Sequence, residues 1–383
     1  MSVSAAPPPA LSYVLTDEQR QLQEMVRDLM TERATSERVR EVMLAEAPGY
    51  DEQLWQELAG YGLLGLTIPE SDGGAGASFA ELAIVLEEAG RRLAPVPLLS
   101  SAVLGTEAVL GGADDAQRAA LLPGVAAGTT RLALAHLDVS GDLLAAPGVV
   151  ASRDGGSWRL DGTAAYVIDG AAATHLVVAA RTDDGLELFV VGGDAPGVAR
   201  TAVEALDLTR PLATIEFAGV EVAEADRLAG GPPMAALHRA LTAGVVAIAV
   251  EQVGGIDHTL QACTAYAGDR FQFGRAIGSF QAIKHRLADM LVELESARSA
   301  AMHAARVLAA GERDELAIAA PLAKSYCSEV YERTAADGIQ IFGGIGFTWE
   351  HDQHLYLKRA KSTKLLLGDP KHHRALLGDL LEL

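Results

Sequence analysis

Apolar residues in the first third of the chain recur every three or four positions, which is the spacing of one helix face. Thr16 stands before the first such run, with Gln19 three residues later, which is the pattern of an N-terminal capping box. Further helices are expected over 51–61, over 79–91, and after Pro95 and Pro97 up to about residue 127. The pattern predicts an N-terminal helical domain over residues 1–130, of which residues 1–10 are a loose tail.

The pattern changes between residues 131 and 230, where short apolar and β-branched runs alternate with turn residues. Asp-Gly and Gly-Gly pairs separate several of the runs, as they do in β-hairpins. The expected strands are 131–135, 158–160, 164–168, 175–180, 186–191 and 214–217. Together they predict a compact antiparallel β-domain over residues 131–230.

Helical spacing returns after Pro232-Pro233 and continues to the end of the chain. The first helix, over about 234–268, is lined by glycine and alanine, and small residues let helices pack closely. Two more long helices are expected over 280–310 and 312–340, and a shorter one closes the chain. The sequence therefore predicts an α+β fold that is mainly α, with a C-terminal four-helix bundle over residues 231–383.

Composition excludes several classes of protein. With 383 residues, 49% of them hydrophobic, the chain can bury a sizeable core. A net charge of -20 opposes binding to phosphate backbones, so no nucleic-acid partner is expected. Cys263 and Cys327 are too few for a disulfide framework, which favours a reducing cytoplasm. No run reaches the roughly 18 uninterrupted apolar residues of a membrane helix, so membrane insertion is not expected, and no metal site is expected either.

Two blocks in the last third of the chain carry candidate binding chemistry. The arginine block is Arg270-Phe271-Gln272-Phe273-Gly274, followed by Gln281, and the glycine block is Gln340-Ile341-Phe342-Gly343-Gly344. A guanidinium can bind a pyrophosphate bidentately, and paired glycines let a backbone approach a ligand closely. Both blocks resemble motifs of the acyl-CoA dehydrogenase family at the expected separation. Because Gly65-Leu66-Thr67-Ile68-Pro69-Glu70 resembles the N-terminal signature, the likeness covers nearly the whole chain.

The resemblance implies an acyl-CoA dehydrogenase fold, an FAD cofactor and an acyl-CoA substrate. In that family the two blocks reach across a subunit interface to the adenosine and pyrophosphate half of a neighbour's FAD, so a dimer or tetramer is expected. The residues assigned to FAD in this way are Arg270, Phe273, Gly274, Gln281, Gln340, Gly343 and Gly344. The simpler alternatives are a surface arginine at a helix end and a Gly-Gly turn after a helix.

The segments that hold the flavin ring in the family are eroded here. A threonine-glutamate-proline segment is replaced by Leu134-Ala135-His136-Leu137-Asp138, and a tryptophan-isoleucine-threonine-asparagine segment by Tyr166-Val167-Ile168-Asp169. Tyr166 is the one remaining candidate for ring stacking, although an ordinary strand tyrosine is an equal alternative. Ile168 cannot form the hydrogen bond that threonine would form. His136 is interpreted as a surface or packing histidine.

The two positions where the resemblance places a catalytic glutamate also lack a carboxylate. They are Leu367 and Gly244 in this chain. Asp369 is two residues beyond the first position and is followed by Pro370, so it is a candidate base or the N-cap of the last helix. Glu251 lies two helical turns after Gly244, on nearly the same face, and is a candidate base or half of a buried ion pair.

Motifs for a partner's FAD are therefore kept, whereas those for the chain's own flavin ring and base are degraded. This asymmetry resembles actinobacterial α2β2 dehydrogenases that act on steroid-derived or other bulky acyl-CoA thioesters and pass electrons to an electron-transfer acceptor. Three hypotheses stay open: a subunit of such a heteromer, a self-sufficient homo-oligomer using Asp369 or Glu251, and a non-enzymatic CoA-binding or scaffold subunit.

Overall fold

The computed structural model describes residues 14–45 and 49–382, and the tail expected over residues 1–10 lies outside them. Helix α1 (Asp17–Arg33) begins with the expected capping box: the Thr16 hydroxyl accepts from the N–H of Gln19, and the Gln19 side chain accepts from the N–H of Thr16. The next α-helices are α2 (Ser36–Leu44), α3 (Glu52–Gly60), α4 (Phe79–Arg92), α5 (Thr106–Gly112) and α6 (Asp115–Ala126).

The helical run expected after Pro97 is not a uniform α-helix. Residues Leu98–Gly105 form a π-helix that leads directly into α5. The Thr106 hydroxyl donates to the carbonyl of Ser101 at 2.8 Å, five residues back along this wider turn. A β-carbon on Gly105 would lie 2.2 Å from Leu132 Cβ, so the segment passes very close to the first strand.

The middle sheet is mixed, whereas the sequence predicted a wholly antiparallel one. Strand β4 pairs in parallel with β1 and β2, because long connections rather than hairpins join those strands to it. The expected strands 158–160 and 164–168 are one long strand with two irregularities, one after Leu160 and one before Val167. Two further strands, 149–154 and 198–202, were not predicted. The strands are β1 (Leu132–Ala135), β2 (Val149–Asp154), β3 (Ser157–Ile168), β4 (His175–Thr182), β5 (Gly185–Gly192), β6 (Val198–Ala202) and β7 (Leu212–Ala223), in the order β1-β4-β2-β3-β7-β6 with β5 on β4.

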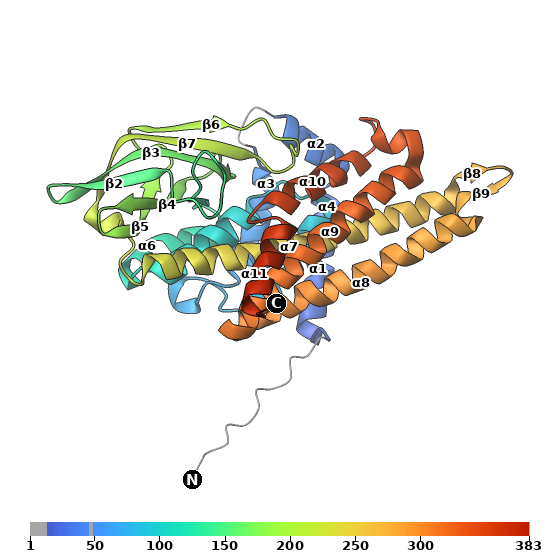
Figure 1. The fold of residues 1–383 in the computed structure, drawn as a ribbon, viewed down its shortest axis with the longest axis horizontal. Coiled ribbons are helices and arrows are strands. Elements are labelled where there is room, and N and C mark those ends of the chain that lie inside the picture. The colour runs from blue at the N-terminus through green and yellow to red at the C-terminus, as the bar shows by residue number, and fades with distance from the viewer. Residues whose placement is uncertain (1–13, 46–48, 383) are drawn as a thin grey trace, which may run out of the picture.

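Three long helices dominate the last part of the chain: α7 (Pro233–Asp269), α8 (Gln281–Ala310) and α9 (Arg313–Phe342). A short hairpin, β8 (Phe271–Gln272) and β9 (Arg275–Ala276), joins α7 to α8 and projects at the far end of the bundle (Figure 1). The chain closes with two short helices, α10 (Gln353–Leu365) and α11 (Pro370–Leu380), where one was expected. A turn through Gly368 and Pro370 interrupts the helical run.

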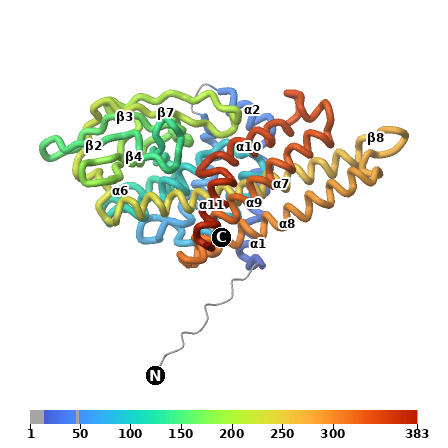
Figure 2. Tube along the Cα trace, in the orientation of Figure 1, coloured from blue at the N-terminus to red at the C-terminus, as the bar shows by residue number. Residues whose placement is uncertain are grey.

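One hydrophobic cluster joins the N-terminal helices to the C-terminal bundle, and a second fills the sheet. Helix α7 runs through the middle of the first cluster, beneath the sheet and between the other helices (Figure 2). It is long and apolar enough to cross a membrane, but 61% of its most apolar window is buried inside the protein, as in a core helix. No other helix of the described residues passes that test.

Candidate functional site

The arginine block forms the end of α7 and the hairpin after it. Arg270 closes α7 by donating its N–H to the carbonyl of Tyr266 at 2.8 Å. Phe273 and Gly274 are the central residues of the β8–β9 turn and have φ values of 53° and 77°, the sign found in type I′ hairpin turns. The positive φ strains the backbone of Phe273, and the residue is 93% exposed. Arg270 is exposed and forms no ion pair with any residue that the structure describes, so its guanidinium is free to bind a group outside them.

The glycine block lies beside the arginine block, at the end of α9. Tyr266 lies one helical turn before Arg270, and its ring packs against the ring of Phe342 in the glycine block, with centroids 4.5 Å apart. This contact brings the two blocks together. Gly343 ends α9 with a φ of 65°, which favours glycine. Gly344 has no positive φ, and a β-carbon there would meet nothing within 4 Å among the residues that the structure describes. Any need for glycine at Gly344 therefore comes from a group outside this chain.

The other residues predicted to contact the cofactor here are Gln340 and Gln281, and both side chains are exposed. Large apolar side chains of the β8–β9 hairpin and of the segment after α9 are exposed. They are Phe271, Phe273, Ile345, Phe347 and Trp349, each between 47% and 93% exposed. Exposed apolar groups at one place on a protein mark an interaction site.

The segments predicted to face the flavin ring are adjacent in the sheet. Leu137 pairs with Ala165 in an isolated antiparallel bridge, which sets His136 and Tyr166 at neighbouring positions. Tyr166 has a φ of 54°, is 40% exposed, and lies so close to Gly141 that a β-carbon there would come 2.9 Å from its ring. The described residues offer no hydrogen-bond partner to the buried ring nitrogens of His136. Burial lowers the pKa of His136 to about 4, so it is a neutral packing group.

These observations test whether the residues present fit FAD. The adenosine and pyrophosphate half fits, because Arg270 and Gln340 are exposed and Gly344 leaves room for a close approach. The ring half fits poorly, because Ile168 is buried and apolar and the nitrogens of His136 are shielded. The chain is therefore suited to one half of the cofactor and not to the other.

The two positions expected to carry the base are buried and apolar. A β-carbon on Gly244 would lie 2.5 Å from Leu104 Cδ2 and 2.7 Å from Leu367 Cδ1, so leucines fill the space around it. Leu104 and Leu367 are 2% and 7% exposed. Leu104 could not be identified from the sequence, because its contact with Gly244 depends on the path of the π-helix.

The turn that carries Leu367 is held at two carbonyl groups. Leu367 and Gly368 have φ values of 56° and 100°. His373 Nε2 lies 3.0 Å from the Leu367 oxygen, and Lys324 Nζ donates to the Gly368 oxygen at 2.9 Å. Lys324 is fully buried, and burial lowers its pKa to about 7. The sequence analysis missed Lys324, although a lysine among Pro321, Ala323 and Cys327 was a signal.

Glu251 has the structural role that was one of its two predicted alternatives. Nη2 of Arg210 lies 2.8 Å and 2.6 Å from the two Glu251 carboxylate oxygens, and both side chains are less than 10% exposed. A second buried pair, Arg359 with Asp207 at 2.8 Å, lies in the same region of the fold. Glu251 is therefore engaged as the counterion of Arg210.

Asp369 is the N-cap of α11. Its carboxylate accepts from the N–H of His372 at 2.8 Å, and this hydrogen bond is the main cause that lowers the pKa of Asp369. Both candidate bases thus have structural partners. Among the described residues, no group of three or more His, Cys, Asp or Glu side chains could hold a metal ion.

Known protein families match both helical parts of the chain. Residues 16–129 match the acyl-CoA dehydrogenase N-terminal domain, and residues 234–381 match the acyl-CoA dehydrogenase C-terminal domain. The chain is 34% identical over 356 residues to acyl-CoA dehydrogenase IpdE2 of Mycobacterium tuberculosis, covering 93% of this chain and 94% of that protein.

Solved structures share the whole fold. A variant of the steroid acyl-CoA dehydrogenase Tcur3481-Tcur3483 is 36% identical with a TM-score of 0.86, covering 95% of this chain and 98% of that one. The ChsE4-ChsE5 complex of Mycobacterium tuberculosis is 30% identical with a TM-score of 0.88, covering 97% of this chain and 99% of that one.

Proposed function

Because the chain belongs to the acyl-CoA dehydrogenase family, whose members are oxidoreductases with FAD as cofactor, we propose that it acts in α,β-dehydrogenation of an acyl-CoA thioester as one subunit of a heteromer. In this proposal Arg270, Phe273, Gln340 and Gly344 contact the adenosine and pyrophosphate half of an FAD bound mainly by another subunit. The observation that carries the proposal is the contrast between these exposed residues and the buried, apolar base position at Leu367.

The chemistry of the reaction sets what each subunit must provide. A base removes the proton α to the thioester carbonyl while a hydride leaves the β-carbon. FAD, when bound, accepts that hydride. Neither Leu367 nor Gly244 can accept a proton, so a carboxylate of the partner subunit takes that role. This chain contributes the Arg270 guanidinium to the pyrophosphate, the Gln340 amide to hydrogen bonding, and apolar cover from Phe273.

Association follows from the same features. The exposed apolar side chains around the two blocks need a partner surface, and the cofactor site is complete only when one is present. The named relatives include a steroid acyl-CoA dehydrogenase and a two-component complex, which supports a heteromer acting on a bulky, steroid-like thioester. We place this complex in the cytoplasm, with a separate electron-transfer protein as the acceptor.

Flavin content of the purified chain, alone and co-expressed with a paralogous subunit that keeps its glutamate, tests the proposal. We expect colourless protein alone, and a yellow complex that turns over acyl-CoA when the partner is present. Yellow, active protein from this chain alone would support a self-sufficient enzyme instead. Failure to gain flavin with any such partner would support a CoA-binding or scaffold subunit.

A further inference from the structure

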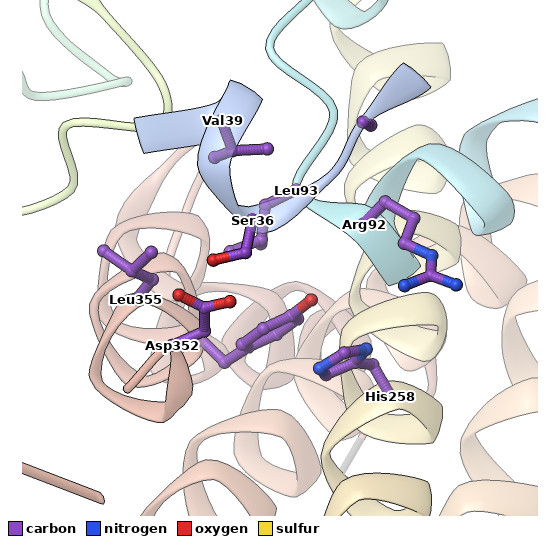
Figure 3. Close-up of a pocket in the computed structure, with 9 residues that line it drawn as sticks. Ser36, Val39, Arg92, Leu93, His258, Asp352 and Leu355 are labelled. Carbon is purple, nitrogen blue, oxygen red and sulfur yellow. The ribbon is translucent and has the colours of Figure 1, made fainter. Parts of the chain in front are cut away.

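A pocket apart from the cofactor blocks lies where the first helices meet α10. Figure 3 shows Arg92 and His258 on one side of it, and Ser36 and Asp352 on the other. Leu93 and Leu355 supply apolar wall. The volume open to water is about 60 Å³. Since one water needs about 10–15 Å³ by this measure, the pocket has room for roughly four to six water-sized atoms.

Arg92 is the charged group in this pocket that lacks a counterion. Its Nη2 donates to the Thr31 hydroxyl at 2.9 Å, and no carboxylate of the described residues lies within ion-pair distance. Nε of Arg92 is buried and has no hydrogen-bond partner among the described residues. The guanidinium of Arg92 therefore has fewer acceptors than donors, and an acceptor in the pocket is favoured.

The other polar groups of the pocket do not cancel the charge of Arg92. Asp352 is already paired with Arg40, at 2.7 Å. His258 is stacked on Tyr356 with ring centroids 4.2 Å apart, and burial, aided by Arg92, lowers its pKa to about 4, so the ring is neutral near pH 7. The pocket therefore carries an excess of one positive charge.

The N-terminus of α2 adds to this preference for an anion. Ser36 is the first residue of α2. The Thr35 hydroxyl accepts from the N–H of Arg38, so it does not cap the N–H groups of Ser36 and Glu37. Free N–H groups and the helix dipole at such an end favour negative charge. The helix end and Arg92 thus act on the same small volume.

We propose that this pocket binds a small carboxylate with a short apolar tail. The carboxylate accepts from the guanidinium of Arg92 and from Ser36, and the tail lies against Leu93 and Leu355. The balance of one cation and apolar wall favours a monoanion with a hydrocarbon part over a compact, multiply charged anion. A ligand held there joins α2 and α4 to α10, the helix that leads to the Leu367 turn. This inference does not rest on the proposed function.

Ligand-observed NMR titration of the full-length protein with sodium butyrate tests the assignment. We expect saturable binding with a dissociation constant on the order of 1 mM, as befits a ligand of six heavy atoms. Arg92→Gln should weaken it about tenfold or more, because a charge-assisted hydrogen bond is lost. Ser36→Ala should weaken it less, and Arg20→Gln, at an exposed arginine paired with Asp17, should leave it unchanged.

Three outcomes would overturn the proposal. Absence of butyrate binding by the wild-type protein would mean that the pocket holds ordered water only. Equal affinity for butyramide would show that charge is not recognised, and equal affinity for inorganic phosphate would show that the apolar wall is not used. Retention of wild-type affinity by Arg92→Gln would place the bound butyrate elsewhere, and a crystal structure with butyrate would locate it.

Discussion

Leu367 lies directly against Gly244, since a β-carbon added to Gly244 would come within 2.7 Å of Leu367 Cδ1. These two residues are far apart in sequence, one on α7 and the other in the turn after α10. They are also the two positions at which resemblance to the family places the base. Their contact explains how either position can carry the catalytic base. A carboxylate at one position would occupy the same space as a carboxylate at the other. Here that shared space is apolar, so neither position supplies the base.

Asp369→Asn should leave turnover of the assembled complex within about tenfold of wild type, below the 10²–10⁴ loss expected for a true general base. Asparagine caps a helix about as well as aspartate, so stability should change little. Asp369→Ala is the matched control: it removes the cap and should cost about 0.5–2 kcal/mol in urea unfolding, with turnover per bound flavin unchanged. A large loss of turnover in Asp369→Asn with flavin retained would make this residue the base.

Glu251→Gln should lower stability without abolishing activity. The change leaves Arg210 buried without its counterion, and breaking a buried pair in this way costs about 3–5 kcal/mol. Thermal unfolding measures that loss, and turnover normalised to bound flavin should stay close to wild type at a temperature where the variant is folded. Folded, flavin-loaded protein with turnover reduced by 10² or more would contradict the structural role.

Arg270→Ala should remove FAD from the complex while the isolated chain stays folded. The guanidinium has no ion pair with the described residues, so its loss costs the fold little. Its proposed contact with the pyrophosphate is a charge-assisted hydrogen bond, and removing it should weaken FAD binding about tenfold or more. Flavin absorbance after gel filtration and circular dichroism provide the two readouts. Wild-type flavin affinity would rule out the assignment.

Gly344→Val should lower FAD occupancy by steric exclusion rather than by unfolding. A β-carbon there meets nothing within 4 Å in the described part of the chain, so the melting temperature of the isolated subunit should hardly change. Gly378→Val is a suitable control. A β-carbon on Gly378 also meets no described residue within 4 Å, and Gly378 lies on α11, away from both blocks. If the two variants bind FAD equally well, the proposed approach of the cofactor to Gly344 is wrong.

Lys324 should make stability depend on pH. Burial lowers its pKa from 10.5 to about 7, so between those values the unfolded chain holds a proton that the folded chain lacks. The destabilisation caused by burying Lys324 is therefore greatest below about pH 7, and it decreases as the pH rises across that window. The urea midpoint of unfolding should increase more between pH 7 and pH 9 in the wild type than in Lys324→Met. Equal slopes would show that Lys324 does not titrate there.

The local pattern of the sequence was enough for most of the helices. The capping box at Thr16 and the long apolar periodicity after Pro233 act within a few residues of the chain. They place the start of α1 and both ends of α7 almost to the residue. The arginine and glycine blocks were identified for the same reason, since each is a short run of consecutive residues that can be recognised in the sequence. The arginine block is exposed, and in the glycine block Gln340, Gly343 and Gly344 are exposed while Ile341 and Phe342 are buried.

Only the tertiary structure decided what depends on distant partners. Strand direction around β4 follows from long connections that no local pattern encodes, so the parallel pairs were missed. The sequence left Glu251 and Asp369 each with two roles, and the Arg210 ion pair and the His372 cap became visible only after folding. The sequence by itself determined that both base positions lack a carboxylate. Folding decided that Leu367 and Gly244 meet, because contact between residues on separate helices is set by packing rather than by order along the chain.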